Sequence, residues 1–167
     1  MDFLIENLAD HLKAIPTIAS WHLKQWGDIM PDRTPESYGR FLSTHFKPDG
    51  IPTMYVAVYQ DAVIGTAALE DDAMDTHPEF TPWLAWLYTD VKYRKNGVGE
   101  ALAKKVIEEA RSINVKKLYV FTPDRQHYHE RFGFRTLFQE NYYGNMESVM
   151  ALVMDKPDPP QPWWIDK

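Results

Sequence analysis

The sequence contains no cysteine, no excess of positive charge and no long apolar run. Without cysteine, the chain forms no disulfide, no thiolate metal site and no cysteine nucleophile. Its net charge of −6 provides no overall basic footprint, so we expect no nucleic-acid partner. No apolar stretch approaches the roughly 20 residues that cross a bilayer, and the first residues, MDFLIENLADH, lack the basic start of a secretion signal. We therefore expect a cytoplasmic protein with no membrane partner.

Length and composition predict one folded domain followed by a short tail. The chain has 167 residues, of which 44% are hydrophobic, and this is enough for a single core. Residues 155–167 differ, because they hold four of the twelve prolines together with Trp163 and Trp164. We predict a domain over residues 1–154 and a Pro/Trp-rich tail over residues 155–167. The tryptophans either pin this tail to the domain or form a contact in a homodimer.

The spacing of apolar side chains predicts a helical beginning and then a mixture of strands and helices. Within the first fifty residues, helices are expected over residues 15–26 and from Pro35 onwards, with Thr34 as the N-cap of the second. A hairpin of β-branched and aromatic residues follows over residues 54–69. Further strands are predicted at residues 83–88, 117–121, 135–142 and 147–154, and further helices at residues 99–111 and 125–132.

Two glycines, Gly97 and Gly99, stand where the strand at residues 83–88 leads into an amphipathic helix. A helix N-terminus offers unpaired backbone N–H groups and a positive dipole end, and glycine lets a phosphate approach the backbone. Arg94 and Lys95 add positive charge beside the turn. This arrangement predicts an anion site, although two glycines also suit an ordinary loop.

Three phosphate-binding patterns compete for this turn. A P-loop has Lys followed by Ser or Thr after its last glycine, where this chain has Glu100 and Ala101. A dinucleotide-binding turn has a third glycine, where this chain has Leu102. A turn that holds the pyrophosphate of coenzyme A remains, with the dinucleotide-binding domain as an alternative.

The order of motifs resembles the GNAT superfamily of N-acetyltransferases. Residues 94–99, RKNGVG, are similar to its Arg/Gln-x-x-Gly-x-Gly signature, and residues 129–134, HERFGF, are similar to its Tyr-x-x-x-Gly-Phe box. The hairpin at 54–69 and the strands at 118–122 and 146–154 resemble other parts of that fold. The resemblance covers roughly residues 16–154. It implies an α/β (α+β) fold in which helices flank a mixed, mostly antiparallel sheet with a splay between its fourth and fifth strands.

The resemblance also implies that residues 1–154 bind acetyl-CoA and transfer its acetyl group directly to a primary amine of a small molecule or peptide, with no metal. The backbone of Leu87, Tyr88 and Thr89 would contact the pantetheine arm and the acetyl carbonyl. The implied pyrophosphate contacts are Arg94, Lys95, Asn96, Gly97, Val98, Gly99 and Glu100.

The residue that protonates the departing thiolate is less clear, because His129 stands at the position of the family's tyrosine. Three alternatives are open: His129 is the acid, its neighbour Tyr128 is the acid, or water supplies the proton. The departure from the pattern also keeps open a coenzyme A-binding sensor or a weakly active relative.

The acceptor site is expected near the acidic segment at residues 70–79, which precedes the fourth strand. Asp75 and His77 are candidates to bind or deprotonate the amine, and Trp83 or Trp86 is a candidate to line its pocket. The alternatives are a solvated acidic loop and tryptophans that belong to the core.

Overall fold

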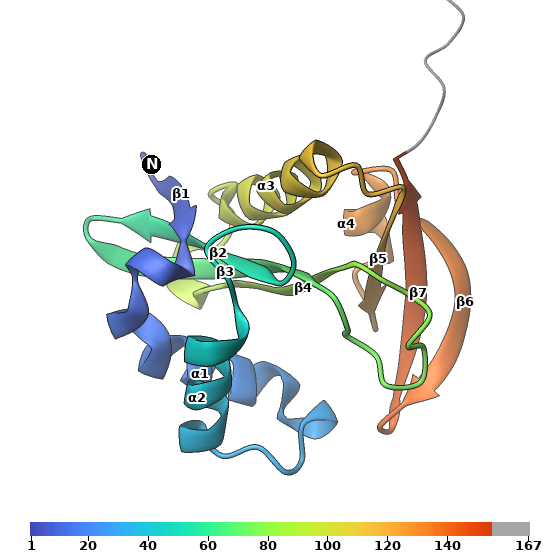
Figure 1. Cartoon of the computed structure of the whole chain (residues 1–167), viewed down its shortest axis with the longest axis horizontal. Helices are drawn as coiled ribbons and strands as arrows, with labels where there is room; N and C mark the ends of the chain where they lie inside the picture. Colours follow the sequence, from blue (N-terminus) through green and yellow to red (C-terminus); the bar gives the residue numbers. More distant parts are fainter. Residues whose placement is uncertain (155–167) are drawn as a thin grey trace, which may run out of the picture.

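A seven-stranded sheet with helices on both faces forms the described part of the chain (Figure 1). The computed structural model describes residues 1–154, so the predicted tail and its homodimer contact lie outside the described residues. The main elements are β1 (Leu4–Asn7), α1 (Ile15–Trp26), α2 (Pro35–His45), β2 (Thr53–Tyr59), β3 (Ala62–Glu70), β4 (Trp83–Thr89), α3 (Val98–Ser112), β5 (Lys117–Thr122), α4 (Gln126–Glu130), β6 (Arg135–Tyr142) and β7 (Asn145–Val153). Within these residues no helix has the length and apolarity to traverse a bilayer.

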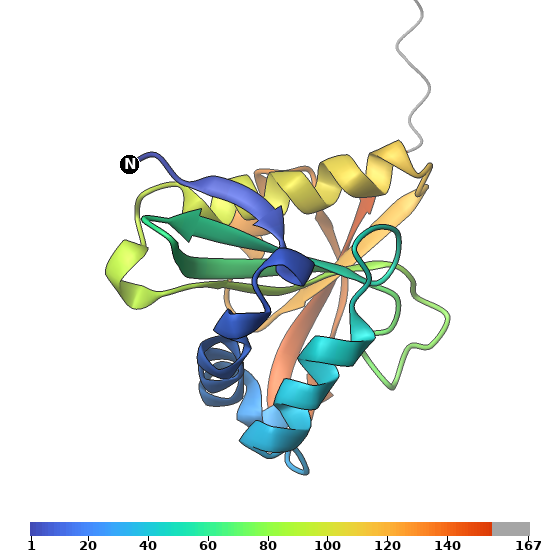
Figure 2. The same cartoon turned by 60° about the vertical axis from the view of Figure 1, so that its left-hand side comes forward.

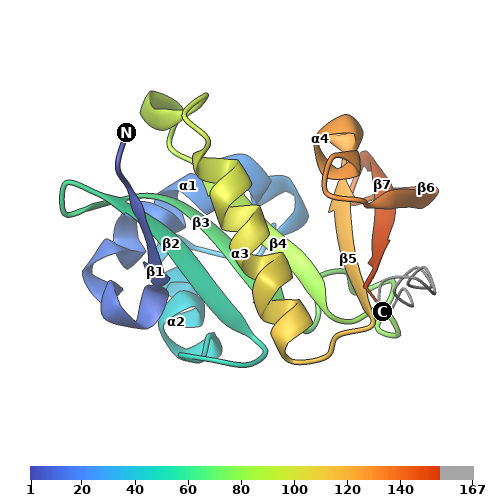
Figure 3. The same ribbon diagram turned by 90° about the horizontal axis from the view of Figure 1, so that it is seen from above.

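The strand order is β1-β2-β3-β4-β5-β7-β6, and every neighbouring pair is antiparallel except β4 and β5. The register of the parallel pair contains one residue from each strand, Trp83 opposite Tyr119. Past this point the two strands diverge, as Figure 3 shows from above. The mixed, mostly antiparallel sheet with a splay between β4 and β5 is therefore confirmed.

Helices α1 and α2 pack on one face of the sheet and α3 packs on the other (Figures 1 and 2). The start of α2 agrees with its sequence signals. The Thr34 hydroxyl accepts a hydrogen bond from the Ser37 N–H at 3.1 Å, and the Ser37 hydroxyl accepts one from the Thr34 N–H at 2.9 Å. These reciprocal bonds satisfy two N–H groups that the helix itself leaves unpaired.

The opposite face of the sheet is covered by α3, which begins and ends within one residue of its predicted bounds. Its apolar stripe points into the core, as the helical spacing predicts. The buried side chains of α3 are Val98, Leu102, Ala103, Val106, Ile107 and Ala110.

The amino-terminal segment corrects the expectation of a purely helical beginning. Residues Leu4–Asn7 form the edge strand β1, in which Leu4 lies opposite Val58 of β2. A strand of four residues is too short to show a clear alternation of apolar and polar side chains. Its pairing with β2, rather than its own pattern, determines its conformation.

A chain of hydrogen bonds crosses the buried space between α1, α2 and the sheet. His22 Nδ1 lies 2.6 Å from the Tyr38 hydroxyl, and His22 Nε2 lies 2.8 Å from the hydroxyl of Thr66. The Thr66 hydroxyl donates its one hydrogen to the carbonyl of Trp86 at 2.8 Å. It therefore accepts from His22 Nε2–H, and Nδ1 accepts from Tyr38. Burial lowers the pKa of His22 to about 3, so the ring is neutral and the direction of the chain is defined.

This chain of bonds ends at a bulge in β4. The pairing of β3 with β4 shifts register between Thr66 and Ala68, and Trp86 has a φ of 54°. A left-handed backbone is unfavourable for a bulky residue and persists only where its surroundings hold it. The hydrogen bond from Thr66 and the stacking of the Trp86 ring on His22, with centroids 5.5 Å apart, supply that support.

We predict that Thr66→Val lowers the free energy of unfolding by about 1–3 kcal/mol, because it leaves the buried His22 N–H and the Trp86 carbonyl without partners. Thr66→Ser keeps the hydroxyl and serves as the matched control, with a smaller loss. Urea denaturation measures both. Equal stability of the valine variant and the wild type would show that the chain of bonds contributes nothing.

Candidate functional site

The turn between β4 and α3 is held in shape by its own side chains. Asp90 accepts a hydrogen bond from the Lys92 N–H at 3.2 Å, and Arg94 Nε donates to the Thr89 carbonyl at 3.0 Å. Asn96 Nδ2 donates to the carbonyls of Tyr93 and Arg94 at 3.1 and 3.0 Å. These bonds order the turn before any ligand is bound.

The start of α3 has no side-chain cap. Its N-cap residue is Gly97, which has a φ of 79°, and open space surrounds the position where a Cβ would lie. The N–H groups of the first helical turn therefore face the exposed turn without a partner from an N-cap side chain. This is the arrangement that binds phosphate groups at helix N-termini.

The residues predicted to contact the cofactor surround this helix start. Arg94, Lys95 and Asn96 are exposed, whereas the side chain of Val98 is buried in the core. Glu100 is half-buried, and its carboxylate pairs with Lys104 at 2.8 Å and Arg131 at 3.4 Å. Because a carboxylate repels phosphate, Glu100 can assist an anion only through its backbone N–H.

Tyr128 of α4 reaches the same helix start. A Cβ built at Gly99 would lie 3.2 Å from the Tyr128 hydroxyl and 3.6 Å from the Thr89 hydroxyl. Glycine at this position thus leaves room for two hydroxyl groups beside the N-terminus of α3. Burial raises the pKa of Tyr128 above its ordinary value, so its hydroxyl keeps its proton at neutral pH.

His129 points elsewhere, because neighbouring residues on a helix are about 100° apart. Its ring is 5% exposed and packs edge-on against Phe134 with centroids 5.8 Å apart. Burial lowers the pKa of His129 to about 4, and its Nδ1 is buried without a hydrogen-bond partner among the described residues. The ring is therefore neutral near pH 7 and lacks the proton that an imidazolium acid would donate.

Three of the acceptor-site candidates, Asp75, His77 and Trp83, make contacts that anchor the β3–β4 loop. Asp75 accepts a hydrogen bond from the Tyr143 hydroxyl at 2.5 Å. His77 lies between Glu79 and Glu140, with N···O distances of 3.1 and 2.9 Å. Trp83 is completely buried and donates its indole N–H to a loop carbonyl at 2.7 Å. These contacts give the acidic loop a structural role.

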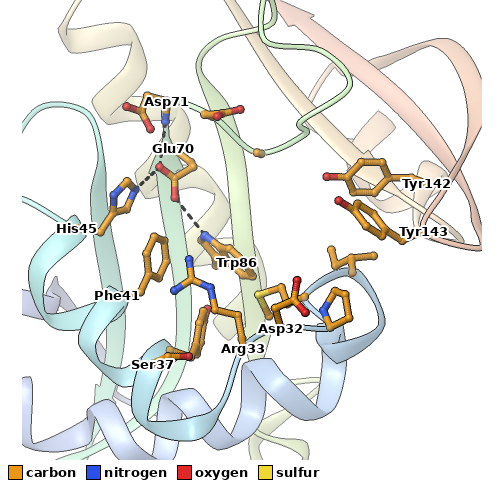
Figure 4. A pocket seen from close by; sticks show the side chains of 16 residues that line it. Asp32, Arg33, Ser37, Phe41, His45, Glu70, Asp71, Trp86, Tyr142 and Tyr143 are labelled. Carbon is orange, nitrogen blue, oxygen red and sulfur yellow. Dashed lines mark hydrogen bonds and ion pairs between the residues drawn. The ribbon is translucent and has the colours of Figure 1, made fainter.

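A cavity of about 790 Å³ opens beside this loop, on the α2 face of the sheet (Figure 4). Segments far apart in the sequence line it: the residues before α2, α2 itself, the end of β3, the bulge of β4, and the end of β6. The lining residues that carry polar or aromatic groups are Asp32, Arg33, Ser37, Tyr38, Phe41, His45, Glu70, Asp71, Asp72, Trp86, Tyr142 and Tyr143. The sequence pointed to Trp86 and to the acidic segment at residues 70–79, which contains Glu70, Asp71 and Asp72, but not to the lining residues from α2, from the residues before it and from the end of β6.

Glu70, the last residue of β3, is the most buried carboxylate of this cavity, with 2% of its surface exposed. Its Oε1 lies 2.6 Å from His45 Nε2 and 3.2 Å from the Asp71 N–H, and its Oε2 accepts from Trp86 Nε1 at 3.3 Å. Burial raises the pKa of the Glu70 carboxyl, and the bond from His45 offsets part of that rise. In the sequence, the feature that could have indicated Glu70 as a site residue is its position as a carboxylate at the end of an apolar strand.

Two other features bear on ligand binding. Donor atoms of His45, Glu70 and Asp71 lie within 4.8 Å of one another, a spacing that a metal ion could bridge. A second buried carboxyl, Glu147 on β7, has an Oε2 without a hydrogen-bond partner among the described residues. Burial and the nearby Asp124 raise the pKa of Glu147 to about 7. Glu147 is not among the residues that line the cavity.

Comparison with known proteins agrees with this geometry. The family model of the Acetyltransferase (GNAT) family matches residues 15–134. A search of curated proteins found no sequence with significant similarity to the chain.

Among solved structures, the chain is similar to an N-acetyltransferase of Staphylococcus aureus, with 16% identity, a TM-score of 0.70, and coverage of 92% of this chain and 99% of the other. It is also similar to a Salmonella typhimurium protein, assigned as an acetyltransferase and solved with acetyl-CoA, with 17% identity, a TM-score of 0.70, and coverage of 96% and 98%. At these identities the likeness shows the fold. Together with the family match over most of the chain, it identifies the protein as a member of the GNAT family of acetyltransferases.

Proposed function

We propose that the protein transfers the acetyl group of acetyl-CoA directly to a primary amine of a small molecule or peptide. The observation that carries this proposal is the uncapped N-terminus of α3 beside the strand β4, which has separated from β5. The first turn of α3 would hold the pyrophosphate, and the backbone of Leu87, Tyr88 and Thr89 would pair with the pantetheine arm. The absence of cysteine favours attack by the amine itself over an acyl-cysteine intermediate.

Tyr128 is the acid that we propose for the departing thiolate. As the amine attacks the thioester, negative charge develops first on the carbonyl oxygen and then on the sulfur. The Tyr128 hydroxyl lies at the start of α3, retains its proton at neutral pH, and reaches the side of the turn where the cofactor would enter. His129, which is buried and neutral, is better explained as a core residue.

We predict that acetyl-CoA at about 100 times its dissociation constant stabilises the protein by about 2.7 kcal/mol, whereas NAD does not. Gly97→Ala should weaken this stabilisation, because an alanine is strained at a φ of 79° and would deform the turn. Gly50→Ala is the matched control, since Gly50 also has a positive φ, 84°, with open space around it. Thermal denaturation with and without ligand measures both; equal stabilisation by NAD would refute the assignment.

A coenzyme A-binding sensor would show the same stabilisation by acetyl-CoA. It would differ in releasing no free coenzyme A when amines are added. A thiol assay over a panel of amines therefore separates a sensor from an acetyltransferase.

We predict that Tyr128→Phe lowers kcat by about 10²-fold while the KM for acetyl-CoA stays within about threefold, because only the proton donor is removed. His129→Phe should keep kcat within about threefold of the wild type. Steady-state kinetics at several pH values measure both variants. A larger loss in the His129 variant than in the Tyr128 variant would restore His129 as the acid.

The buried His129 also predicts a pH dependence of stability. Its pKa is about 4 in the folded protein and 6.5 in the unfolded chain, so the unfolded state binds the proton first as the pH falls. Between pH 7 and pH 5 the wild type should therefore lose about 1–2 kcal/mol relative to His129→Phe. Urea denaturation of both proteins at the two pH values measures this difference, and a constant difference would contradict the neutral assignment.

A further inference from the structure

Building on the proposed acetyl transfer, we propose that Glu70 takes the proton from the attacking amine and that the cavity around it accepts a small amine with a second positive charge. Two features of the cavity support this proposal. One is the position of the buried Glu70 carboxylate, and the other is the charge and aromaticity of the side chains that surround it.

The hydrogen bonds that Glu70 receives from His45 and Trp86 favour its charged form, whereas burial and the side chain of Asp71 oppose it. The indole N–H of Trp86 and the backbone N–H of Asp71 can only donate, so both require an acceptor on Glu70. His45 Nε2 lies 2.6 Å from Oε1 and completes the support on that side. Each carboxylate oxygen can accept more than one hydrogen bond. Among the described residues Oε2 accepts from Trp86, which leaves it a lone pair for an ammonium group. Figure 4 shows Glu70 between His45 and Trp86.

Glu70 is also placed on the strand that would carry the cofactor. Its partner Trp86 directly precedes Leu87, where the proposed pantetheine contacts begin. The bond from the Thr66 hydroxyl to the Trp86 carbonyl holds this bulge in position. An amine bound against Glu70 would thus approach β4 from the α2 face, opposite the helix start that would hold the pyrophosphate.

The surroundings of Glu70 suit a proton acceptor that works near neutral pH. Burial raises the pKa of its carboxyl, which narrows the gap to the pKa of about 10 of an alkylammonium. The titratable and charged groups that share the cavity are His45 and Tyr38 from α2, Asp32 and Arg33 before it, Asp71 and Asp72 after β3, and Tyr142 and Tyr143 at the end of β6.

The charge and shape of the cavity select the substrate class. Four carboxylates, those of Asp32, Glu70, Asp71 and Asp72, face it together with one guanidinium. That guanidinium, on Arg33, lies 4.7 Å above the Phe41 ring and is already engaged there. Aromatic rings form much of the remaining wall and favour cations and carbon chains alike. The volume of about 790 Å³ suits a small molecule. With Glu70 occupied by the reacting amine, Asp71 and Asp72 remain for a second ammonium.

The step balances without a further reactant. The ammonium gives one proton to Glu70, and the neutral amine attacks the thioester carbon to form the C–N bond. The C–S bond then breaks, and the thiolate gains a proton from Tyr128. The nitrogen loses its second proton, which passes through solvent to Tyr128 and restores the hydroxyl. The products are the amide, the thiol of coenzyme A, and one proton that passes from Glu70 to solvent.

The base is tested with Glu70→Gln, which keeps the size of the side chain and its hydrogen-bond acceptor. With hexamethylenediamine as the acceptor, kcat/KM at pH 7 should fall by about 10²-fold. It should recover towards the wild-type value as the pH rises towards the pKa of the amine, about 10, because a neutral amine needs no base. Stabilisation by acetyl-CoA should be unchanged. The matched control, Glu36→Gln, alters an exposed carboxylate of α2 outside the cavity and should behave as wild type.

Four results would overturn the assignment of Glu70. The first is a Glu70→Gln variant within about threefold of wild type at pH 7. The second is loss of acetyl-CoA stabilisation in that variant, which would make Glu70 a structural residue. The third is a Glu147→Gln variant, altered at the other buried carboxyl, that loses kcat/KM at pH 7 and recovers it at high pH while Glu70→Gln does not. Activity that is lost in EDTA and restored by a divalent metal would also overturn it, since His45, Glu70 and Asp71 would then be metal ligands.

The substrate class is tested with a matched pair of amines. Hexamethylenediamine and hexylamine differ in one terminal ammonium group, and wild-type kcat/KM should be at least about tenfold higher for the diamine. The double variant Asp71→Asn with Asp72→Asn should remove this preference, and the ratio of kcat/KM for the two amines is the readout. Equal kcat/KM values of the wild type for the two amines would refute the proposal that the cavity binds a second positive charge of the substrate. If acetyl-CoA binds but no amine of any kind releases coenzyme A, the proposed function fails instead.

Discussion

The separation of β4 from β5 is the constraint on which the rest of the site depends. The two strands pair at Trp83 and Tyr119 and then diverge, so the edge of β4 that follows has no strand beside it. Backbone groups without a partner are unfavourable once they are removed from water. A ligand that supplies hydrogen-bonding groups along β4 would satisfy them. The helix start of α3 and the Tyr128 hydroxyl both lie at the end of this strand, where such a ligand would be held.

On the α2 face of the sheet, the conformation of β4 depends on a buried series of hydrogen bonds between polar side chains. Tyr38, His22 and Thr66 pass hydrogen bonds in one direction to the carbonyl of Trp86 and thereby hold a backbone conformation that a tryptophan rarely adopts. The same tryptophan donates its indole N–H to Glu70. One bulged residue therefore links the core of the α1–α2 layer to the wall of the cavity. The proposed cofactor side and acceptor side meet on a single strand.

Local signals in the sequence predicted much of the fold. The capping pair at Thr34, the apolar stripe of α3 and the glycine at position 97 each act within a few residues, so they can be recognised without the partner surfaces. The edge strand β1 was missed because its conformation depends on pairing with β2. The choice between Tyr128 and His129 was left open for a similar reason. A shift of one residue turns a helix face by about 100°, and the packing of α4 decides which side chain points at α3.

The sequence by itself determined the family, the mixed sheet and the proposed site of the anion-binding turn, because those depend on short motifs in a fixed order. Only the tertiary structure decided which acidic residues line the cavity. Asp75 and His77 were plausible by position, but they bind the β6–β7 hairpin, whereas Glu70 meets a histidine 25 residues earlier in the chain. Burial and charge pairing arise from contacts between distant segments. For that reason the pocket and its chemistry appear only when the chain is folded.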